Sequence, residues 1–228
     1  MARMPDVLEA RLNAYLDGLL PPRDPLLADL EAQAREERIP ISGPHVGHLL
    51  AVLIGATRPA RVLEVGTAIG YAAIWMGRML RETGGRLLTV ELRESMAARA
   101  RRNLAAAGLA EVVEVRVGAA LDVLPQLDPG FGLIFLDAVK AEYPAYLEHA
   151  LCLTPPGGLI LADNALLGGE VVPGARPGFW DEEEREGIRA YNARAFSDPA
   201  LLSVILPLHD GVTLSLRRWR ETAAARHA

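Results

Sequence analysis

The strongest constraint on the fold of this chain is a change of pattern at residue 61. From there on, short runs rich in apolar and β-branched residues alternate with longer segments whose apolar residues recur at helical spacing. We expect strands at 61–65, 86–92, 112–118, 132–138, 157–164, 201–208 and 212–219. We expect helices between them at 71–80, 93–108, 119–127, 141–153 and 181–196. This alternation is typical of a mostly parallel α/β sheet with helices on both faces.

The last two strand-like runs are joined by His209-Asp210-Gly211, and Asp-Gly in a tight link is a hairpin signal. The sheet should therefore carry one antiparallel edge. Ahead of residue 58, three more segments have apolar residues at helical spacing, at 5–20, 24–39 and 44–57. With 228 residues, half of them hydrophobic, we expect a single domain in which a helical cap, 1–57, precedes an α/β core, 58–228.

Composition limits the classes of partner. No run of about 18 uncharged apolar residues is present, so we expect no membrane span, and the N-terminus does not resemble a secretion signal. The formal net charge is −5 and the arginines are interleaved with glutamates, which disfavours nucleic-acid binding. The single cysteine, Cys152, excludes a disulfide within the chain, and we expect it to be a buried core thiol. These features favour a cytoplasmic protein.

The first strand ends in a glycine-containing turn, Glu64-Val65-Gly66-Thr67-Ala68-Ile69-Gly70. Glycines in a strand-to-helix turn let a ligand approach the backbone and its N–H groups. The spacing is not the GxGxxG of dinucleotide sites, and an acid two residues before Gly66 would repel a diphosphate. A carboxylate in this place suits a cationic ligand, while a helix-start turn without any ligand is the alternative.

Glu91 stands at the end of the second predicted strand. An acid there can accept hydrogen bonds from both hydroxyl groups of a ribose, as in Rossmann-type nucleotide sites. The alternative is a surface glutamate paired with Arg93. The sequence leaves both interpretations open, although a ligand at the neighbouring glycine turn would favour the ribose.

Polar residues also follow the fourth and fifth predicted strands, where Asp137 and the pair Asp163-Asn164 stand. A carboxylate after an apolar strand is a poor choice for a core because unpaired buried charge is costly. Parallel strands would bring the three side chains to one edge of the sheet, and oxygen ligands without Cys or His suit a hard cation such as Mg²⁺. The alternative is that Asp163 and Asn164 only cap the next turn.

Lys140 is the only lysine among the 24 Lys and Arg residues of the chain. A lysine can serve as a general base when its surroundings lower its pKa, whereas an arginine stays protonated. Because Lys140 lies three residues after the candidate cation ligand Asp137, we interpret it as a candidate base. The alternative is that one lysine survives by chance in an arginine-rich chain.

Together these segments resemble the cation-dependent O-methyltransferases, the family that includes catechol O-methyltransferase and the caffeoyl-coenzyme A O-methyltransferases. EVGTAIGYA resembles the family's cofactor loop, LDAVKAEY its acid–lysine–tyrosine segment, LILADNALLGG its metal segment and HDGVTL its last hairpin. The resemblance runs from about Ile41 to Arg217. It implies a Rossmann-like class I methyltransferase with a seven-stranded, mostly parallel sheet, N-terminal helices and, as in many members, a homodimer.

The resemblance implies a site for S-adenosylmethionine (SAM) formed by Ser42, Glu64, Gly66, Thr67, Tyr71, Ala72, Glu91, Gly118, Ala120 and Asp137. It also implies a divalent cation, Mg²⁺ or else Mn²⁺ or Ca²⁺, held by Asp137, Asp163 and Asn164, with Lys140 and Asp137 as the catalytic residues. Two positions depart from the family pattern. Val139 replaces a common acid, and Ala72 replaces a serine that contacts the methionine part of the cofactor, which should weaken cofactor binding slightly.

The reaction implied is methyl transfer from the sulfonium of SAM to a phenolic oxygen. A phenol, with a pKa of about 10, is mostly protonated at neutral pH, so a cation that stabilises the phenolate and a base such as Lys140 are both useful. Chelation favours a catechol-like small molecule with two neighbouring oxygens. The alternatives are a tRNA hydroxyuridine acceptor, as in some bacterial relatives, a nicotinamide-dependent oxidoreductase, and a non-catalytic module of the same fold.

Three further features each have two interpretations. The Gly- and Pro-rich segment 165–183 is a candidate lid, in which Phe179 and Trp180 would either cover an aromatic acceptor or anchor the loop. Tyr143 would either line the same pocket or pack in the core. The HxxH pair formed by His45 and His48 is a weak metal signal, and a structural role is favoured.

Overall fold

The computed structural model describes residues 6–22 and 24–219 and contains a seven-stranded sheet in the order β3-β2-β1-β4-β5-β7-β6. The strands are β1 (Arg61–Val65), β2 (Arg86–Glu91), β3 (Val113–Val117), β4 (Leu133–Leu136), β5 (Leu159–Ala162), β6 (Leu201–Leu206) and β7 (Val212–Arg217). The pairs among β1 to β5 are parallel, and β7 runs antiparallel to both β5 and β6. The α/β fold class and its antiparallel edge are therefore confirmed.

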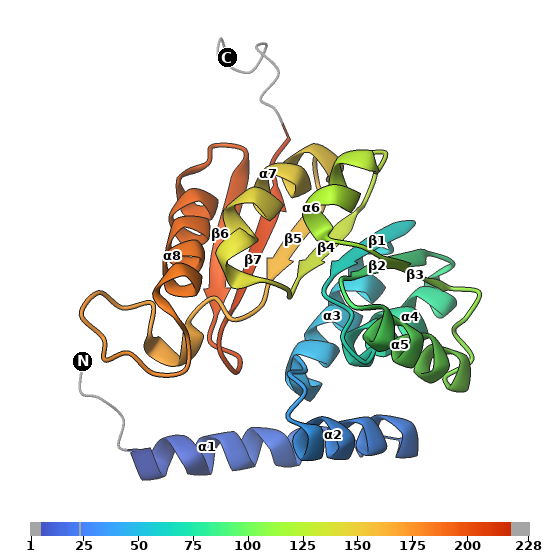
Figure 1. The fold of residues 1–228 in the computed structure, drawn as a ribbon, viewed down its shortest axis with the longest axis horizontal. Coiled ribbons are helices and arrows are strands. Elements are labelled where there is room, and N and C mark those ends of the chain that lie inside the picture. The colour runs from blue at the N-terminus through green and yellow to red at the C-terminus, as the bar shows by residue number, and fades with distance from the viewer. Residues whose placement is uncertain (1–5, 23, 220–228) are drawn as a thin grey trace.

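Eight α-helices accompany the sheet within the described residues, with α1 and α2 end to end along one side of the molecule (Figure 1). They are α1 (Asp6–Leu19), α2 (Pro25–Glu37), α3 (Gly43–Thr57), α4 (Tyr71–Thr83), α5 (Glu94–Ala106), α6 (Ala120–Val123), α7 (Tyr143–Leu153) and α8 (Glu182–Ser197). The 3-10 helices are η1 (Leu124–Gln126), η2 (Lys140–Glu142) and η3 (Leu167–Gly169). None of the helices in this described part is long and apolar enough to cross a membrane.

The sheet has a hydrophobic core on each face because successive side chains of a strand point to opposite sides. Val62 and Leu133 belong to the core shared with α2, α3, α4 and α5. Their neighbours Leu63 and Ile134 belong to the core shared with α6, α7 and α8. Both faces of the central strands are thus covered, which explains why β4 and β5 are apolar throughout instead of alternating with polar residues.

The observed strands after β1 are one to four residues shorter than predicted. β6 ends at Leu206 and not at residue 208, because Pro207 has no N–H to continue the ladder. Cys152 is exposed, so the prediction of a buried core thiol is wrong. On α7 the buried face includes Ala150 and Leu153, and Cys152 lies roughly 200° around the helix from Ala150 because each residue turns it by about 100°.

Candidate active site

The order of the strands reverses between β1 and β4, and open α/β sheets bind ligands at such a point, outside the carboxyl ends of the strands. A cavity of about 870 Å³ lies there, a volume typical of small-molecule sites. The structure brings every residue predicted for the site to the wall of this cavity: Ser42, Glu64, Gly66, Thr67, Tyr71, Ala72, Glu91, Gly118, Ala120, Asp137, Lys140, Asp163 and Asn164.

The turn after β1 is shaped by a close approach to the end of β4. Gly66 has a φ of +101°, and a Cβ on it would lie 1.9 Å from the carbonyl oxygen of Asp137. Gly66 therefore has a packing role in addition to leaving the backbone open to the cavity. Ala68, in the same turn, has a φ of +47°, a conformation that residues with side chains rarely adopt. Gly70 then begins α4 with a φ of +86°.

Glu91, at the end of β2, holds this turn in place. Its Oε2 accepts the backbone N–H of Ala68 at 2.9 Å, and its Oε1 accepts that of Arg93 at 3.0 Å. The guanidinium of Arg93 lies 3.7 Å from the same carboxylate, so the expected ion pair is present, but Glu91 is buried and is not a surface residue. Each carboxylate oxygen keeps a further lone pair with which it can accept a ligand hydroxyl.

Glu64, in β1, is completely buried and borders the cavity. The hydroxyl of Thr89 donates to its Oε2 at 2.5 Å, and the hydroxyl of Thr67 lies 2.5 Å from that of Thr89. Its Oε1 has no hydrogen-bond partner in the described part of the chain. Burial raises the pKa of Glu64 to about 8; Thr89 opposes this, and the charges of Asp137 and Glu91 add to it. The unpartnered oxygen suits a cationic donor in the cavity.

This half of the cavity is completed by three residues, one directly before α3 and two at the start of α4. Ser42, directly before α3, has a buried hydroxyl without a hydrogen-bond partner among residues 6–22 and 24–219. The hydroxyl of Tyr71 donates to Oε1 of Glu31 at 2.7 Å and so ties α4 to α2. Ala72 is buried and adds no polar side-chain group. Ser42 therefore offers a hydroxyl to a polar ligand, whereas Ala72 offers only its backbone.

Asp137 and Asp163 follow the adjacent parallel strands β4 and β5, and both border the cavity. Burial and then the charge of Asp137 raise the pKa of Asp163 well above its usual range; the charge of Lys140 and the N–H of Asn164 oppose this rise. Asn164 has a φ of +59° and donates its backbone N–H to Oδ1 of Asp163 at 2.8 Å. Asp163 and Asn164 therefore form a local turn, and Asp137 and Asp163 also lie at the same edge of the sheet.

Asp210 belongs to this group as well, although the sequence pattern predicts only a hairpin turn there. Its Oδ2 accepts Nδ2 of Asn164 at 3.4 Å, its charge contributes to the raised pKa of Asp163, and it borders the cavity. The pairing of β7 with β5, in which Thr213 faces Ala162, places the link before β7 beside the end of β5. Asp210 is therefore recognised as a residue of the site only from the pairing of β7 with β5.

The residues at this edge fit a divalent cation. Asp137, Asp163 and Asn164 offer only oxygen ligands, which a hard cation prefers. Burial and then repulsion by the charge of Asp137 raise the pKa of Asp163, and a bound cation would oppose both effects. No group of three His, Cys, Asp or Glu side chains that could hold a metal ion occurs in the described ranges. The predicted ligand set contains only two acids, Asp137 and Asp163, beside the amide of Asn164, so it is not a group of that kind. The cation remains a prediction.

Lys140 is buried beside these acids, at the start of η2. Its Nζ donates to Oδ1 of Asp137 at 2.8 Å and to the hydroxyl of Tyr143 at 2.9 Å. Tyr143 is completely buried, and burial, followed by the charge of Asp137, raises its pKa well above the usual value. The structure thus places the only lysine of the chain in the cavity wall, in contact with a candidate cation ligand.

The loop between β5 and α8 borders the cavity and is fixed to α8. The backbone N–H groups of Gly178 and Phe179 donate to the carboxylate of Glu170, and Arg185 donates to Glu170 and to the carbonyl of Trp180. Burial alone would raise the pKa of Glu170, but these hydrogen bonds lower it. Trp180 packs against the core, whereas Phe179 is 86% exposed. Trp180 is therefore the anchor, and Phe179 is free to contact a ligand.

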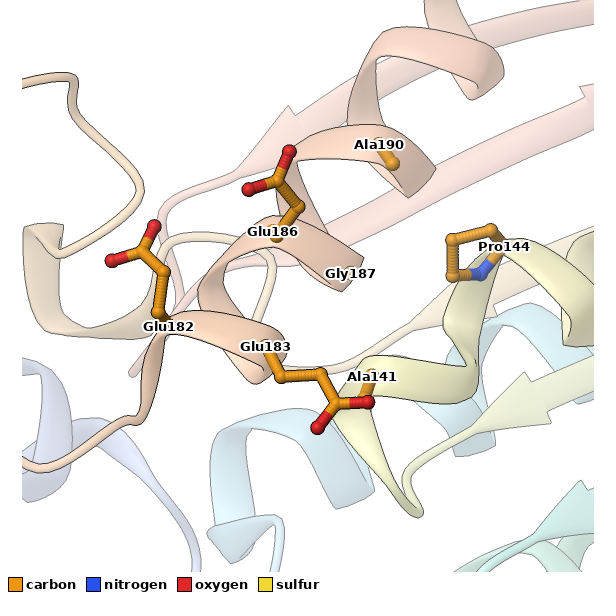
Figure 2. A pocket seen from close by; sticks show the side chains of 7 residues that line it. All are labelled: Ala141, Pro144, Glu182, Glu183, Glu186, Gly187 and Ala190. Atoms are coloured by element: carbon orange, nitrogen blue, oxygen red, sulfur yellow. The ribbon is translucent and has the colours of Figure 1, made fainter.

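A second hollow, of about 330 Å³, lies between η2, the start of α7 and α8 (Figure 2). Glu182, Glu183 and Glu186 line it from α8, and Ala141 and Pro144 line its other side. The lining consists of carboxylates and small apolar groups. This hollow has none of the strand-end residues and is not the candidate active site.

The two histidines of the HxxH pair have structural partners. Nε2 of His45 lies 2.8 Å from Oδ1 of Asp17, and Nδ1 of His48 lies 2.9 Å from the carbonyl oxygen of Pro44. The ring of His48 also packs against that of Trp75, tilted by 47° with the ring centroids 4.4 Å apart. These contacts support the structural interpretation.

Residues 24–218 match the protein family described as O-methyltransferase. The chain belongs to this family. The match begins at Asp24, directly before α2, and so earlier than the resemblance at Ile41 indicates. A catechol O-methyltransferase from Niastella koreensis is 37% identical over 220 residues, which cover 90% of this chain and 96% of that protein. A catechol O-methyltransferase from Mycobacterium tuberculosis is 41% identical over 165 residues, which cover 71% and 74%.

Solved structures of other O-methyltransferases agree with this assignment. TomG from Streptomyces achromogenes, which is involved in tomaymycin synthesis and was solved in complex with SAM, superposes with a TM-score of 0.79 at 34% identity, over 92% of this chain and 96% of TomG. The O-methyltransferase from Bacillus cereus, solved in complex with S-adenosylhomocysteine (SAH), gives 0.80 at 32% identity, over 91% and 97%. The protein is therefore an O-methyltransferase, and the oxidoreductase alternative is excluded.

Proposed function

We propose that this O-methyltransferase binds SAM in the large cavity and, with a divalent cation, methylates one of two neighbouring oxygens of a catechol-like small molecule. The observation that carries the proposal is the place of Lys140, whose Nζ lies 2.8 Å from Asp137 in the wall of the cavity. Relatives named catechol O-methyltransferase and solved relatives that hold SAM or SAH support it.

The residues at the ends of β1 and β2 would recognise the cofactor. The free Oε1 of Glu64 suits the ammonium of the methionine part, and the remaining lone pairs of Glu91 suit the ribose hydroxyls. The first N–H groups of α4 suit the carboxylate, since the first turn of a helix leaves its donors unused. Ala72 lies in that turn and contributes its N–H without the serine hydroxyl of the family.

The residues at the ends of β4 and β5 would prepare the acceptor. Asp137, Asp163 and Asn164 would hold the cation, which supplies positive charge to stabilise a phenolate. Lys140 would accept the phenol proton at Nζ, and the resulting ammonium would stay paired with Asp137. The same walls align the acceptor oxygen with the methyl donor, which removes much of the entropic barrier.

A homodimer and a cytoplasmic location remain predictions. On α1, Leu12, Tyr15, Leu16 and Leu19 recur at helical spacing and are 42%, 63%, 39% and 63% exposed. An apolar stripe of this kind is a surface that a second copy of the chain would cover. Light scattering should give the mass of a dimer for the wild type and a lower mass for Leu16→Glu.

A methylation screen tests the proposed function. SAM would be offered with a catechol, a matched monophenol, a hydroxycinnamoyl thioester, a flavonoid and bulk tRNA, each with and without Mg²⁺. We expect transfer to acceptors with two neighbouring oxygens, and only with Mg²⁺. Transfer to tRNA with none to any phenol would instead establish the hydroxyuridine alternative. The net charge of −5 disfavours that alternative, because it disfavours binding to nucleic acid.

A further inference from the structure

Tyr143, the first residue of α7, lies directly behind Lys140. Its hydroxyl oxygen is 2.9 Å from Nζ of Lys140, 3.1 Å from the carbonyl oxygen of Leu136 and 3.2 Å from that of Asp163. A phenol hydroxyl has a single proton, and both carbonyls can only accept it. The hydroxyl therefore gives its proton to the end of β4 or of β5 and presents a lone pair to Lys140.

The position of this hydroxyl is fixed by its surroundings. Tyr143 is completely buried, and its ring packs edge-on against that of Tyr191 at 5.6 Å and against that of Tyr146 at 5.9 Å. Tyr143 is not one of the residues that line the cavity. Of the two interpretations left by the sequence, packing is therefore correct, but the hydroxyl end of the ring is in contact with the candidate base.

The geometry at Nζ of Lys140 gives this contact a consequence. Besides its bond to Cε, Nζ of a lysine has three tetrahedral positions. Asp137 and Tyr143 occupy two of them as hydrogen-bond acceptors, at 2.8 Å and 2.9 Å. The third position is then fixed in direction and is the one left to face the cavity, whose wall includes Lys140. Without the acceptor at Tyr143, the end of the side chain can rotate about its last torsions and turn this position away from the substrate.

We propose that Tyr143 is a positioning residue, whose hydroxyl orients Nζ of Lys140 so that the one tetrahedral position left by Asp137 and Tyr143 faces the acceptor. This inference rests on the proposed role of Lys140 as the base. Tyr143 does not touch the substrate, the cofactor or the reacting atoms. It acts through its hydrogen bond with Lys140. The backbone carbonyls at the ends of β4 and β5 fix the position of its hydroxyl, and the hydroxyl in turn fixes the position of Nζ.

The kinetic test compares Tyr143→Phe with Tyr191→Phe. The first variant keeps the ring and removes the hydroxyl next to Lys140. The second removes an equally buried hydroxyl that has no partner in the described part of the protein and does not line the cavity. We expect Tyr143→Phe to lower kcat on the order of tenfold to a hundredfold, with the KM for SAM changed by less than about twofold, because alignment is lost and binding is not. Tyr191→Phe should leave kcat unchanged.

A double-mutant cycle separates this inference from the function on which it rests. Lys140→Met should abolish most turnover, and adding Tyr143→Phe should then change nothing further, because the hydroxyl acts only through the amine. Undiminished turnover in Lys140→Met would refute the base and the positioning together. A large effect of Lys140→Met with wild-type kcat in Tyr143→Phe would refute the positioning alone.

A second measurement does not depend on turnover. Because Lys140 is the only lysine, protein labelled with [13Cε]lysine gives a single side-chain CεH₂ signal. A side chain whose Nζ is held by two acceptors has a fixed torsion about Cδ–Cε and should give two distinct Hε resonances in the wild type and in Tyr191→Phe. Loss of the Tyr143 acceptor should let this torsion average, so that the two resonances approach each other in Tyr143→Phe. Averaged resonances in the wild type, or an unchanged separation in Tyr143→Phe, would overturn the proposal. The wild-type spectrum decides the question even if Tyr143→Phe fails to fold.

Discussion

The carbonyl oxygen of Asp137 packs so closely against Gly66 that a Cβ at residue 66 would lie 1.9 Å from it. We expect Gly66→Ala to lower the free energy of unfolding by about 2–4 kcal/mol, because the turn must move away from β4 and the φ of +101° is strained for alanine. Urea denaturation of the ligand-free protein measures this loss.

Gly84→Ala is the matched control for this clash. Gly84 also has a positive φ, of +83°, but a Cβ there would meet nothing within 4 Å. Its substitution should cost only the conformational strain, about 1 kcal/mol. Equal losses in the two variants would show that the contact with Asp137 does not constrain Gly66.

Glu64 should make the stability of the ligand-free protein depend on pH. Its pKa is about 8 in the fold and 4.5 in an ordinary environment. The folded state therefore keeps the proton where the unfolded state has lost it, and the stability contributed by protonated Glu64 is complete below pH 4.5 and is lost as the pH rises through 8. The slope should reach about 1.4 kcal/mol per pH unit in this window.

Glu64→Gln isolates that dependence, since the amide does not titrate. The free energy of unfolding of the wild type, measured relative to that of the variant, should decrease between about pH 5 and pH 8. Urea titrations at several pH values give both curves. Parallel curves would mean that Glu64 is ionised in the folded protein throughout.

Glu170 should control the mobility of the loop that borders the acceptor side of the cavity. Glu170→Ala removes the acceptor for the N–H groups of Gly178 and Phe179 and leaves Arg185 without that partner. We expect amide exchange in the loop to become at least about tenfold faster, because local opening no longer breaks these bonds. The KM for a catechol, offered as the proposed acceptor, should rise while SAH binding is retained.

Glu183→Ala is the control for the loop. Glu183 lies on α8, the helix that carries Arg185, but it lines the second hollow, which Figure 2 shows. Hydrogen exchange read by mass spectrometry and the KM for a catechol should both remain at wild-type values in this variant. Wild-type exchange in Glu170→Ala would contradict the role assigned to that carboxylate.

The sequence predicts the strand-end residues of this site well, for a physical reason. An acid stands at the end of four predicted strands, at Glu64, Glu91, Asp137 and Asp163. An unpaired buried charge is costly, so an acid in such a place indicates a function other than core packing. Parallel strands then bring their carboxyl ends to one edge without any knowledge of loops. Lys140 is recognisable because no other lysine occurs in the chain.

Contacts made between distant elements are not predictable in the same way. Asp210 reaches Asn164 only because β7 pairs with β5, and Glu170 meets Arg185 only when the loop folds back on α8. The buried hydroxyl of Tyr143 depends on the same kind of long-range packing. The spacing of residues within one segment of the sequence does not predict any of these contacts.

The central claim is that oxygen atoms at the ends of β4 and β5 hold a cation that methyl transfer requires. The most direct measurement is methyl transfer from labelled SAM to catechol by chelator-treated protein, before and after Mg²⁺ is added. We predict that turnover falls to background and recovers in the wild type, and that Asp163→Ala does not recover although calorimetry shows retained SAH binding. Turnover that is indifferent to the chelator, or recovery in Asp163→Ala equal to that of the wild type, would contradict the claim.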